Sequence, residues 1–153
     1  MANDVYVPDA NVFFEYIYSR SLQKNARQLV EDAILDKIQL IVPSLLLDKI
    51  TEVLCGNLDN LEEVQIHIQY LETLAAEKVL HIVVPDTAVR MQAIAIARTG
   101  HAKSGYPELS DSLYHALAIM HDAVFVTNDR RHIAKAEIFG HIMPLAQYGW
   151  SKI

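Results

Sequence analysis

Short apolar runs and longer helical patterns alternate along the chain. The apolar runs are rich in β-branched residues and are bounded by polar or helix-breaking residues, which is typical of buried strands. Strands are therefore predicted at residues 5–7, 39–42, 80–84 and 123–126, with an edge strand at 141–144.

The segments between these runs carry apolar residues at the spacing of one helical face. They predict helices at about 11–19, 22–36, 44–54, 59–78, 86–99 and 131–137, and one more helix whose first turn contains Asp111. Gly100 should end the helix at 86–99, residues 101–107 read as a loop, and the tail from residue 145 is unassigned. Alternating strands and helices predict a three-layer α/β fold, with a mainly parallel sheet of about four or five strands and helices on both faces.

Composition and charge narrow the functional classes. The chain has 153 residues, 52% of them hydrophobic, which predicts a single domain with ample core. It has no apolar run long enough for a bilayer and no leader, so no membrane association is expected. The single Cys55 fits a reducing cytoplasm. A net charge of −6 argues against broad nucleic-acid binding over the whole surface, but it leaves room for a local basic rim.

Three aspartates occupy positions that a parallel fold brings together. Asp9 follows the first predicted strand, and Asp129 follows the strand at 123–126 after Thr127 and Asn128. Asp111 lies in the first turn of the helix that precedes that strand. Parallel sheets place ligands at the carboxyl ends of their strands. Carboxylates gathered there repel one another unless a cation or a shared proton compensates, which points to a hard divalent metal ion.

The helix at 44–54 carries two acids and one lysine with different expected orientations. Its apolar stripe is centred between Leu46 and Leu54. Asp48 and Glu52 lie four residues apart on the opposite face and should point to water. Lys49 falls at the edge of the stripe, from which its side chain could reach a cleft.

Three motifs, in this order, resemble the PIN-domain ribonucleases, especially the small bacterial VapC-like toxins. They are VPDANVF with Asp9, SDSLYHALA with Asp111 and VFVTNDRR with Asp129, and the resemblance covers nearly the whole chain. It implies a Rossmann-like parallel sheet and an acidic pocket that binds Mg²⁺ or Mn²⁺. It also implies a metal-dependent endoribonuclease, acting as a toxin in a homodimer restrained by a small antitoxin.

The second motif of the family departs from its pattern here. The family carries a glutamate in a sequence shaped like VPSLLLxE, and an ungapped alignment places that glutamate on Lys49. Three interpretations stay open: Glu52 or Asp48 reaches the pocket through a shifted helix, three aspartates suffice, or the Lys49 ammonium pairs with them in a weakened or inactive enzyme. In the last case the chain would be an RNA- or protein-binding module.

Neighbouring residues have supporting roles in this hypothesis. Asn11, Thr127 and Asn128 would orient carboxylates and waters around the metal ion. Arg130 and Arg131 are candidates for contacts with the RNA backbone, or belong to an ordinary solvated helix start.

Other readings of the same region are weaker. Tyr114 is interpreted as a packing residue, and His115 as a surface or hydrogen-bonded histidine. A phosphatase using Asp9 as nucleophile is a further hypothesis, but no matching nucleophile motif supports it.

Overall fold

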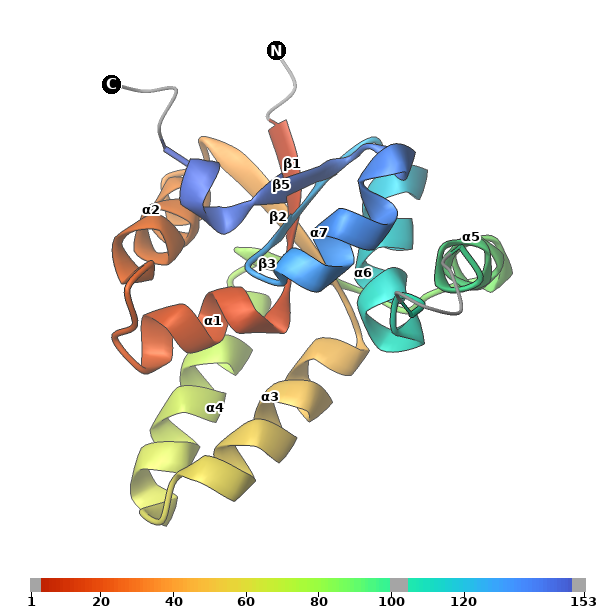
Figure 1. Cartoon of the computed structure of the whole chain (residues 1–153). Coiled ribbons are helices and arrows are strands. Elements are labelled where there is room, and N and C mark those ends of the chain that lie inside the picture. Colours follow the sequence, from red (N-terminus) through yellow and green to blue (C-terminus); the bar gives the residue numbers. More distant parts are fainter. Residues whose placement is uncertain (1–3, 100–104, 150–153) are drawn as a thin grey trace.

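The computed structural model describes residues 4–99 and 105–149, and within them the chain forms a three-layer α/β fold (Figure 1). The sheet has five strands in the order β3-β2-β1-β4-β5, and each neighbouring pair is parallel. The strands are β1 (Asp4–Pro8), β2 (Ile38–Pro43), β3 (Leu80–Val83), β4 (Val124–Thr127) and β5 (Ile142–Pro144). The predicted fold class and the five predicted strands are confirmed.

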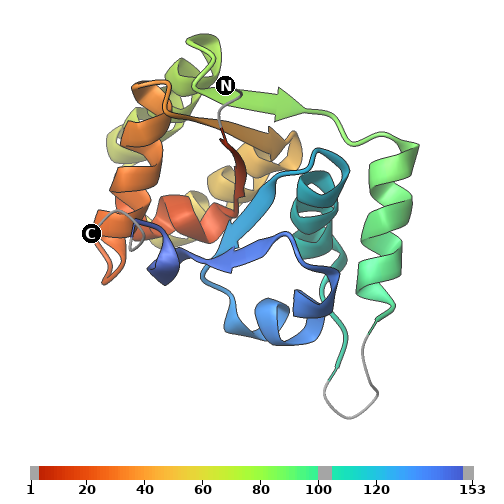
Figure 2. The same ribbon diagram turned by 90° about the horizontal axis from the view of Figure 1, so that it is seen from above.

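Helices connect the strands and cover both faces of the sheet. They are α1 (Ala10–Ile17), α2 (Gln23–Ile34), α3 (Leu45–Asn57), α4 (Leu61–Ala76), α5 (Thr87–Ala97), α6 (Leu109–Met120) and α7 (Arg130–Ala136). Figure 2 shows α1 and α2 on one side of the sheet and α5 and α6 on the other. In Figure 1, α3 and α4 form a hairpin that projects beyond the carboxyl ends of the strands. Within the described ranges, no helix is both long and apolar enough to cross a bilayer.

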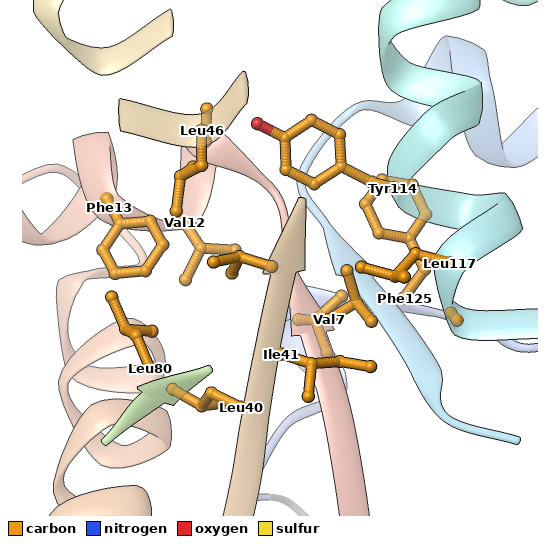
Figure 3. Packing of buried hydrophobic residues seen from close by; sticks show 14 of the residues in the cluster. Val7, Val12, Phe13, Leu40, Ile41, Leu46, Leu80, Tyr114, Leu117 and Phe125 are labelled. Atoms are coloured by element: carbon orange, nitrogen blue, oxygen red, sulfur yellow. The ribbon is translucent and has the colours of Figure 1, made fainter. Parts of the chain in front are cut away.

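The two faces of the sheet explain why its strands read as unbroken apolar runs. Leu40 and Ile41 are adjacent in β2, and Figure 3 shows Leu40 pointing toward Phe13 on one side and Ile41 toward Leu117 on the other. All four side chains are buried. Successive side chains of a strand alternate between faces, so a strand covered on both faces needs apolar residues at every position.

Element boundaries differ from the predicted ones where the backbone turns into the left-handed region. Asp122 has a φ of 51° directly after α6, and Lys78 has a φ of 62° after α4. These turns set the positions at which β3 and β4 begin. The turn residues themselves are polar, so the hydrophobic pattern of the sequence does not mark them. Gly100 and residues 101–104 of the predicted loop lie outside the described residues.

The unassigned tail docks onto α2 and β1 through Tyr148. A short 3₁₀ turn at Leu145–Gln147 brings the buried Tyr148 hydroxyl within 2.6 Å of the Asp32 carboxylate, to which it donates a hydrogen bond. Gln28 donates a second hydrogen bond to the same carboxylate, and the Tyr148 ring meets the Tyr6 ring edge-on. The carboxylate of Asp32 is fully buried, so each donor offsets part of its desolvation.

Replacing Tyr148 with Phe is expected to lower the free energy of unfolding by about 1–2 kcal/mol, because Asp32 loses a buried donor. Urea denaturation at neutral pH measures the difference. Tyr106→Phe, at a residue that is 52% exposed, is the matched control and should leave stability unchanged. Equal stability of Tyr148→Phe and the wild type would show that the hydrogen bond from Tyr148 to Asp32 adds nothing to stability.

Candidate functional site

Asp9 anchors the site at the junction of β1 and α1. It is the N-cap of α1, and its carboxylate accepts a 2.7 Å hydrogen bond from the backbone N–H of Ala10. It accepts two more, at 2.7 Å from the Thr127 hydroxyl and at 3.1 Å from the Asn11 amide. Asp9 is only 5% exposed, so these three donors hold a buried carboxylate in one orientation.

Thr127 joins Asp9 to Asp129. Its hydroxyl oxygen accepts the backbone N–H of Asp129 at 3.0 Å and the Asn11 amide at 3.2 Å. Asp129 is the N-cap of α7 and accepts the backbone N–H groups of Arg131 and His132. The structure therefore places Asn11 and Thr127 directly against the carboxylate of Asp9, and Thr127 also against the backbone of Asp129.

Asn128 has a different contact from the predicted one. Its side-chain amide donates a 2.7 Å hydrogen bond to Glu15, whose carboxylate also accepts the backbone N–H of Leu22 at 3.3 Å. Glu15 is 4% exposed and was missed by the sequence analysis. Its spacing of four residues from Asn11 in an otherwise apolar helix puts both on one helical face, and that spacing could have identified it.

Asp111 completes the acidic group from the first turn of α6. Together with Asp129 and Glu108 it lines a cavity of about 490 Å³. The same cavity is lined by three cationic side chains, Arg130, Arg131 and Lys135. These cations form the local basic rim that the net charge of −6 did not exclude, and they lie in the same cavity as the acidic side chains.

Burial and mutual repulsion raise the pKa of two of the aspartates. Burial raises the pKa of Asp9 to about 6, opposed by the hydrogen bonds from Thr127 and Ala10 and reinforced by the charge of Asp129. Burial, and then the charges of Asp9, Asp129 and Glu108, raise the pKa of Asp111 to about 7. The three aspartates therefore lie close enough to one another for their charges to interact.

Lys49 is the residue of α3 whose charge affects the ionisation of Asp9 and Asp111. Its ammonium lowers the pKa of both Asp9 and Asp111. Among the described residues it forms no ion pair within 4 Å, so it acts at a longer range. Asp48, Lys49 and Glu52 are all exposed, and neither of the two acids contributes to those pKa shifts. Of these three side chains, Lys49 is therefore the one whose charge acts on Asp9 and Asp111.

Tyr114 brings a polar group to the same region. Its ring stacks on Phe125 at 6.0 Å, as expected of a packing residue, and the side chain is 1% exposed. Its hydroxyl has no hydrogen-bond partner among the described residues, and Figure 3 shows it pointing toward Leu46 of α3. Burial, and then the charges of Asp9 and Asp111, raise its pKa. Its spacing of three residues from Asp111 on one helix could have signalled this closeness.

The histidines of the region hold the fold rather than a metal ion. The Nε2 of the buried His115 lies 2.7 Å from the Gly140 carbonyl oxygen, so it carries the proton that it donates. Its Nδ1 then accepts from Nε2 of His132 at 3.1 Å. Burial lowers the pKa of both rings, that of His132 to about 4, so the pair is neutral at pH 7. Of the two predicted alternatives, a surface or a hydrogen-bonded histidine, His115 is the second, and it is buried.

The three aspartates have the chemistry of a site for a hard divalent cation. They supply carboxylate oxygens that repel one another, which a bound cation would relieve. Within residues 4–99 and 105–149, however, no group of three or more His, Cys, Asp or Glu side chains forms a ready-made metal site. Mg²⁺ commonly binds through one or two carboxylates and keeps several waters. The donors therefore fit an ion held partly through water.

Asp111→Asn is expected to stabilise the metal-free protein at high pH. The pKa of Asp111 in the folded protein lies near 7, so its ionisation opposes folding by an amount that grows from about pH 4 and is complete above about pH 7. Near pH 4 most of this penalty is absent, because the folded-state carboxyl is protonated and the unfolded-state carboxyl is only about half ionised. After allowance for partial exposure, the gain is about 1–2 kcal/mol at pH 8. Thermal melts in a chelator at pH 4 and pH 8 measure it.

The exposed Glu52→Gln is the control for that comparison, and its melting temperature should follow the wild type at both pH values. A gain for Asp111→Asn that is equal at pH 4 and pH 8 would contradict an origin in charge repulsion.

Known proteins match this chain in family and in fold. The model of the PIN domain family matches residues 6–138. A chain of a toxin–antitoxin complex from Klebsiella pneumoniae is 14% identical, with a TM-score of 0.60 and coverage of 92% of this chain and 97% of that one. A chain of VapBC2 from Rickettsia felis, bound to a DNA fragment from their promoter, is 16% identical, with a TM-score of 0.64 and coverage of 92% and 96%.

A chain of VapBC-1 from nontypeable Haemophilus influenzae is 13% identical, with a TM-score of 0.66 and coverage of 94% and 99%. Among curated protein sequences, none matches this chain. The structural likeness establishes a shared fold at these identities, and the family match includes all three aspartates. The resemblance drawn from the three motifs is therefore confirmed, and the chain belongs to the PIN domain family.

Proposed function

We propose that this protein is a metal-dependent endoribonuclease that hydrolyses RNA phosphodiester bonds and acts as the toxin of a toxin–antitoxin pair. The observation that carries the proposal is the convergence of Asp9, Asp111 and Asp129, whose charges interact, beside a cavity lined with cations. Membership of the PIN family and the fold shared with toxin–antitoxin chains support it.

Phosphodiester hydrolysis needs an activated water and compensation for the charge that develops on the phosphoryl oxygens. Asp9, Asp111 and Asp129 would hold Mg²⁺ or Mn²⁺, and such an ion supplies both functions. Thr127 and Asn11 fix the orientation of the Asp9 carboxylate through their hydrogen bonds. Burial of Asp9 keeps bulk water from competing for its oxygens.

The substrate would lie along the cationic rim of the acidic cavity. Arg130, Arg131 and Lys135 line that cavity, and guanidinium and ammonium groups bind phosphate oxygens through charge-assisted hydrogen bonds. These contacts would position the RNA backbone without reading its sequence.

The proposed partners are a small antitoxin and a second copy of the chain. The similar solved structures are toxin–antitoxin assemblies by their names, which supports an antitoxin partner here. Leu61 and Ile66 of α4 are exposed apolar side chains that a partner could cover. A location in the reducing cytoplasm stays a prediction from the single cysteine.

A second candidate function is a PIN-like module that binds RNA or protein without cleaving it. The observation in its favour is Lys49, which stands where the resemblance places a glutamate and already compensates part of the charge of Asp9 and Asp111. A cationic side chain whose charge acts on the carboxylates opposes the entry of a divalent ion, even at a longer range than a close ion pair.

Calorimetric titration with Mg²⁺ or Mn²⁺, with RNA cleavage assayed in parallel, separates these functions. We expect the wild type to bind the ion and cut RNA, and Asp9→Asn to reduce cleavage by about 100-fold or more, because it removes a ligand rather than a supporting group. Lys49→Glu should bind the ion more tightly. If the wild type does neither and Lys49→Glu gains both, the second function replaces the first.

Thr127→Val should weaken the affinity for Mn²⁺ by about 10–100-fold, because Asp9 and Asp129 lose the hydroxyl that positions them. Valine nearly preserves the shape of the side chain, so folding should be retained. Thr73→Val in α4 removes a hydroxyl that bonds only to the backbone of its own helix, and it serves as the control. Unchanged affinity in Thr127→Val would show that the hydroxyl does not support metal binding.

A further inference from the structure

A second cavity adjoins the acidic one on the other side of α7. It has a volume of about 740 Å³ and lies between α7, the end of β5 and the turn between α1 and α2. Cavities of about 300–1,000 Å³ are the usual size for small-molecule ligands. A nucleoside therefore fits within it.

The two cavities meet at the start of α7. Asn128 and Arg130 line both of them, and Thr127, which bonds to Asp9, lines the second. Arg130, Ile133, Ala134 and Glu137 face the second cavity at a spacing of three and four residues, which is one face of a helix. Arg131, His132 and Lys135 line the acidic cavity. A polynucleotide with a phosphate in the acidic cavity would therefore bring an adjacent nucleoside to the second one.

The walls of the second cavity suit a flat, largely apolar ring. Leu22 and Ala146 lie toward the α1–α2 turn and the tail, Pro144 ends β5, and Ile133 and Ala134 lie on α7. No aromatic side chain lines it among the described residues. A base would therefore be held between aliphatic groups, with the few polar lining groups setting its orientation.

Two of those polar groups, Asn128 and Glu137, present hydrogen-bond acceptors, whereas the Ser21 hydroxyl can donate or accept and the Arg130 guanidinium, which only donates, lies toward the acidic cavity. Glu15 can only accept, so the Asn128 amide must turn its N–H toward that carboxylate, as the 2.7 Å contact shows. Its Oδ1 accepts no hydrogen bond from the described residues, and Glu137 contributes a carboxylate to the same cavity. Two acceptors favour a base edge with an amino group, as in adenine and cytosine, over uracil, whose single donor, N3–H, is flanked by two carbonyls that the acceptors repel.

We propose that this cavity is a base-binding subsite for the nucleotide next to the scissile phosphate, and that it prefers amino-bearing bases to uracil. The proposal rests on the nuclease function proposed above and adds a determinant of its sequence preference. Arg130, at the boundary of the two cavities, is placed to contact the intervening phosphate.

Binding of cytidine and uridine to the metal-free wild type, followed by NMR of the Ile133 and Ala134 methyl groups, tests the subsite. The two nucleosides have the same sugar and ring size and differ in the amino group or carbonyl at C4 and in the proton on N3. Cytidine should bind about fivefold or more tightly, the size of one net hydrogen bond, and adenosine should also exceed uridine. Glu137→Gln should reduce the preference.

Ala134→Trp should abolish nucleoside binding by filling the cavity. Ala134 is exposed, so the larger side chain does not disturb the core. Ile138→Trp, at a residue that is 77% exposed and does not line the cavity, is the matched control and should bind like the wild type. Equal affinity for cytidine and uridine, or normal binding by Ala134→Trp, would overturn the proposal.

Nucleoside binding requires neither metal nor cleavage, so failure of the subsite and failure of the nuclease function are separate results. In an RNA cleavage assay, Ala134→Trp should raise KM for a preferred sequence and flatten the base preference, whereas Ile138→Trp should keep the KM and the preference of the wild type. If the wild type cleaves RNA and Ala134→Trp keeps its base preference, the subsite is elsewhere.

Discussion

The hydrogen bond from Thr127 to Asp9 is the contact on which the geometry of the site depends. It joins the carboxyl ends of β1 and β4, beside a backbone hydrogen bond from Asp9 N–H to the Val126 carbonyl. Burying an ionised carboxylate is costly unless donors surround it, and Thr127, Asn11 and the Ala10 N–H provide them. Because Thr127 also accepts the Asp129 N–H, the orientation of one aspartate constrains the other.

The charges of the site oppose folding, and this is characteristic of a functional site rather than a structural one. The ionised carboxylates of Asp9 and Asp111 would each have a lower free energy in water, yet the fold holds both close to the charge of Asp129. Lys49 relieves part of this repulsion without forming a close ion pair. The positive charge of Lys49 therefore stabilises the folded protein when no metal ion is bound. The same charge would oppose the binding of a metal ion. Lys49 is therefore compatible with either proposed function.

The sequence predicted the sheet because both of its faces are buried, so β2 and β4 stand out as unbroken apolar runs. It placed Asp9 and Asp129 at strand ends for the same reason. It did not identify Glu15 or the Tyr114 hydroxyl, although helical spacing places them on the same faces as Asn11 and Asp111. The contact of Tyr148 with Asp32 joins residues 116 positions apart through tertiary packing that no local periodicity encodes.

Helix α7 shows how a seven-residue element can divide two chemical environments. Its cap, Asp129, belongs to the acidic group, and its side chains then separate by helical spacing into two sets. Arg131 and Lys135 lie toward the acids, where cations offset negative charge, whereas Ile133 and Ala134 wall an apolar cavity. A nucleotide has the same division, because its phosphate is charged and its base is a flat, largely apolar ring. The two faces of α7 therefore correspond in chemistry to the two parts of one ligand.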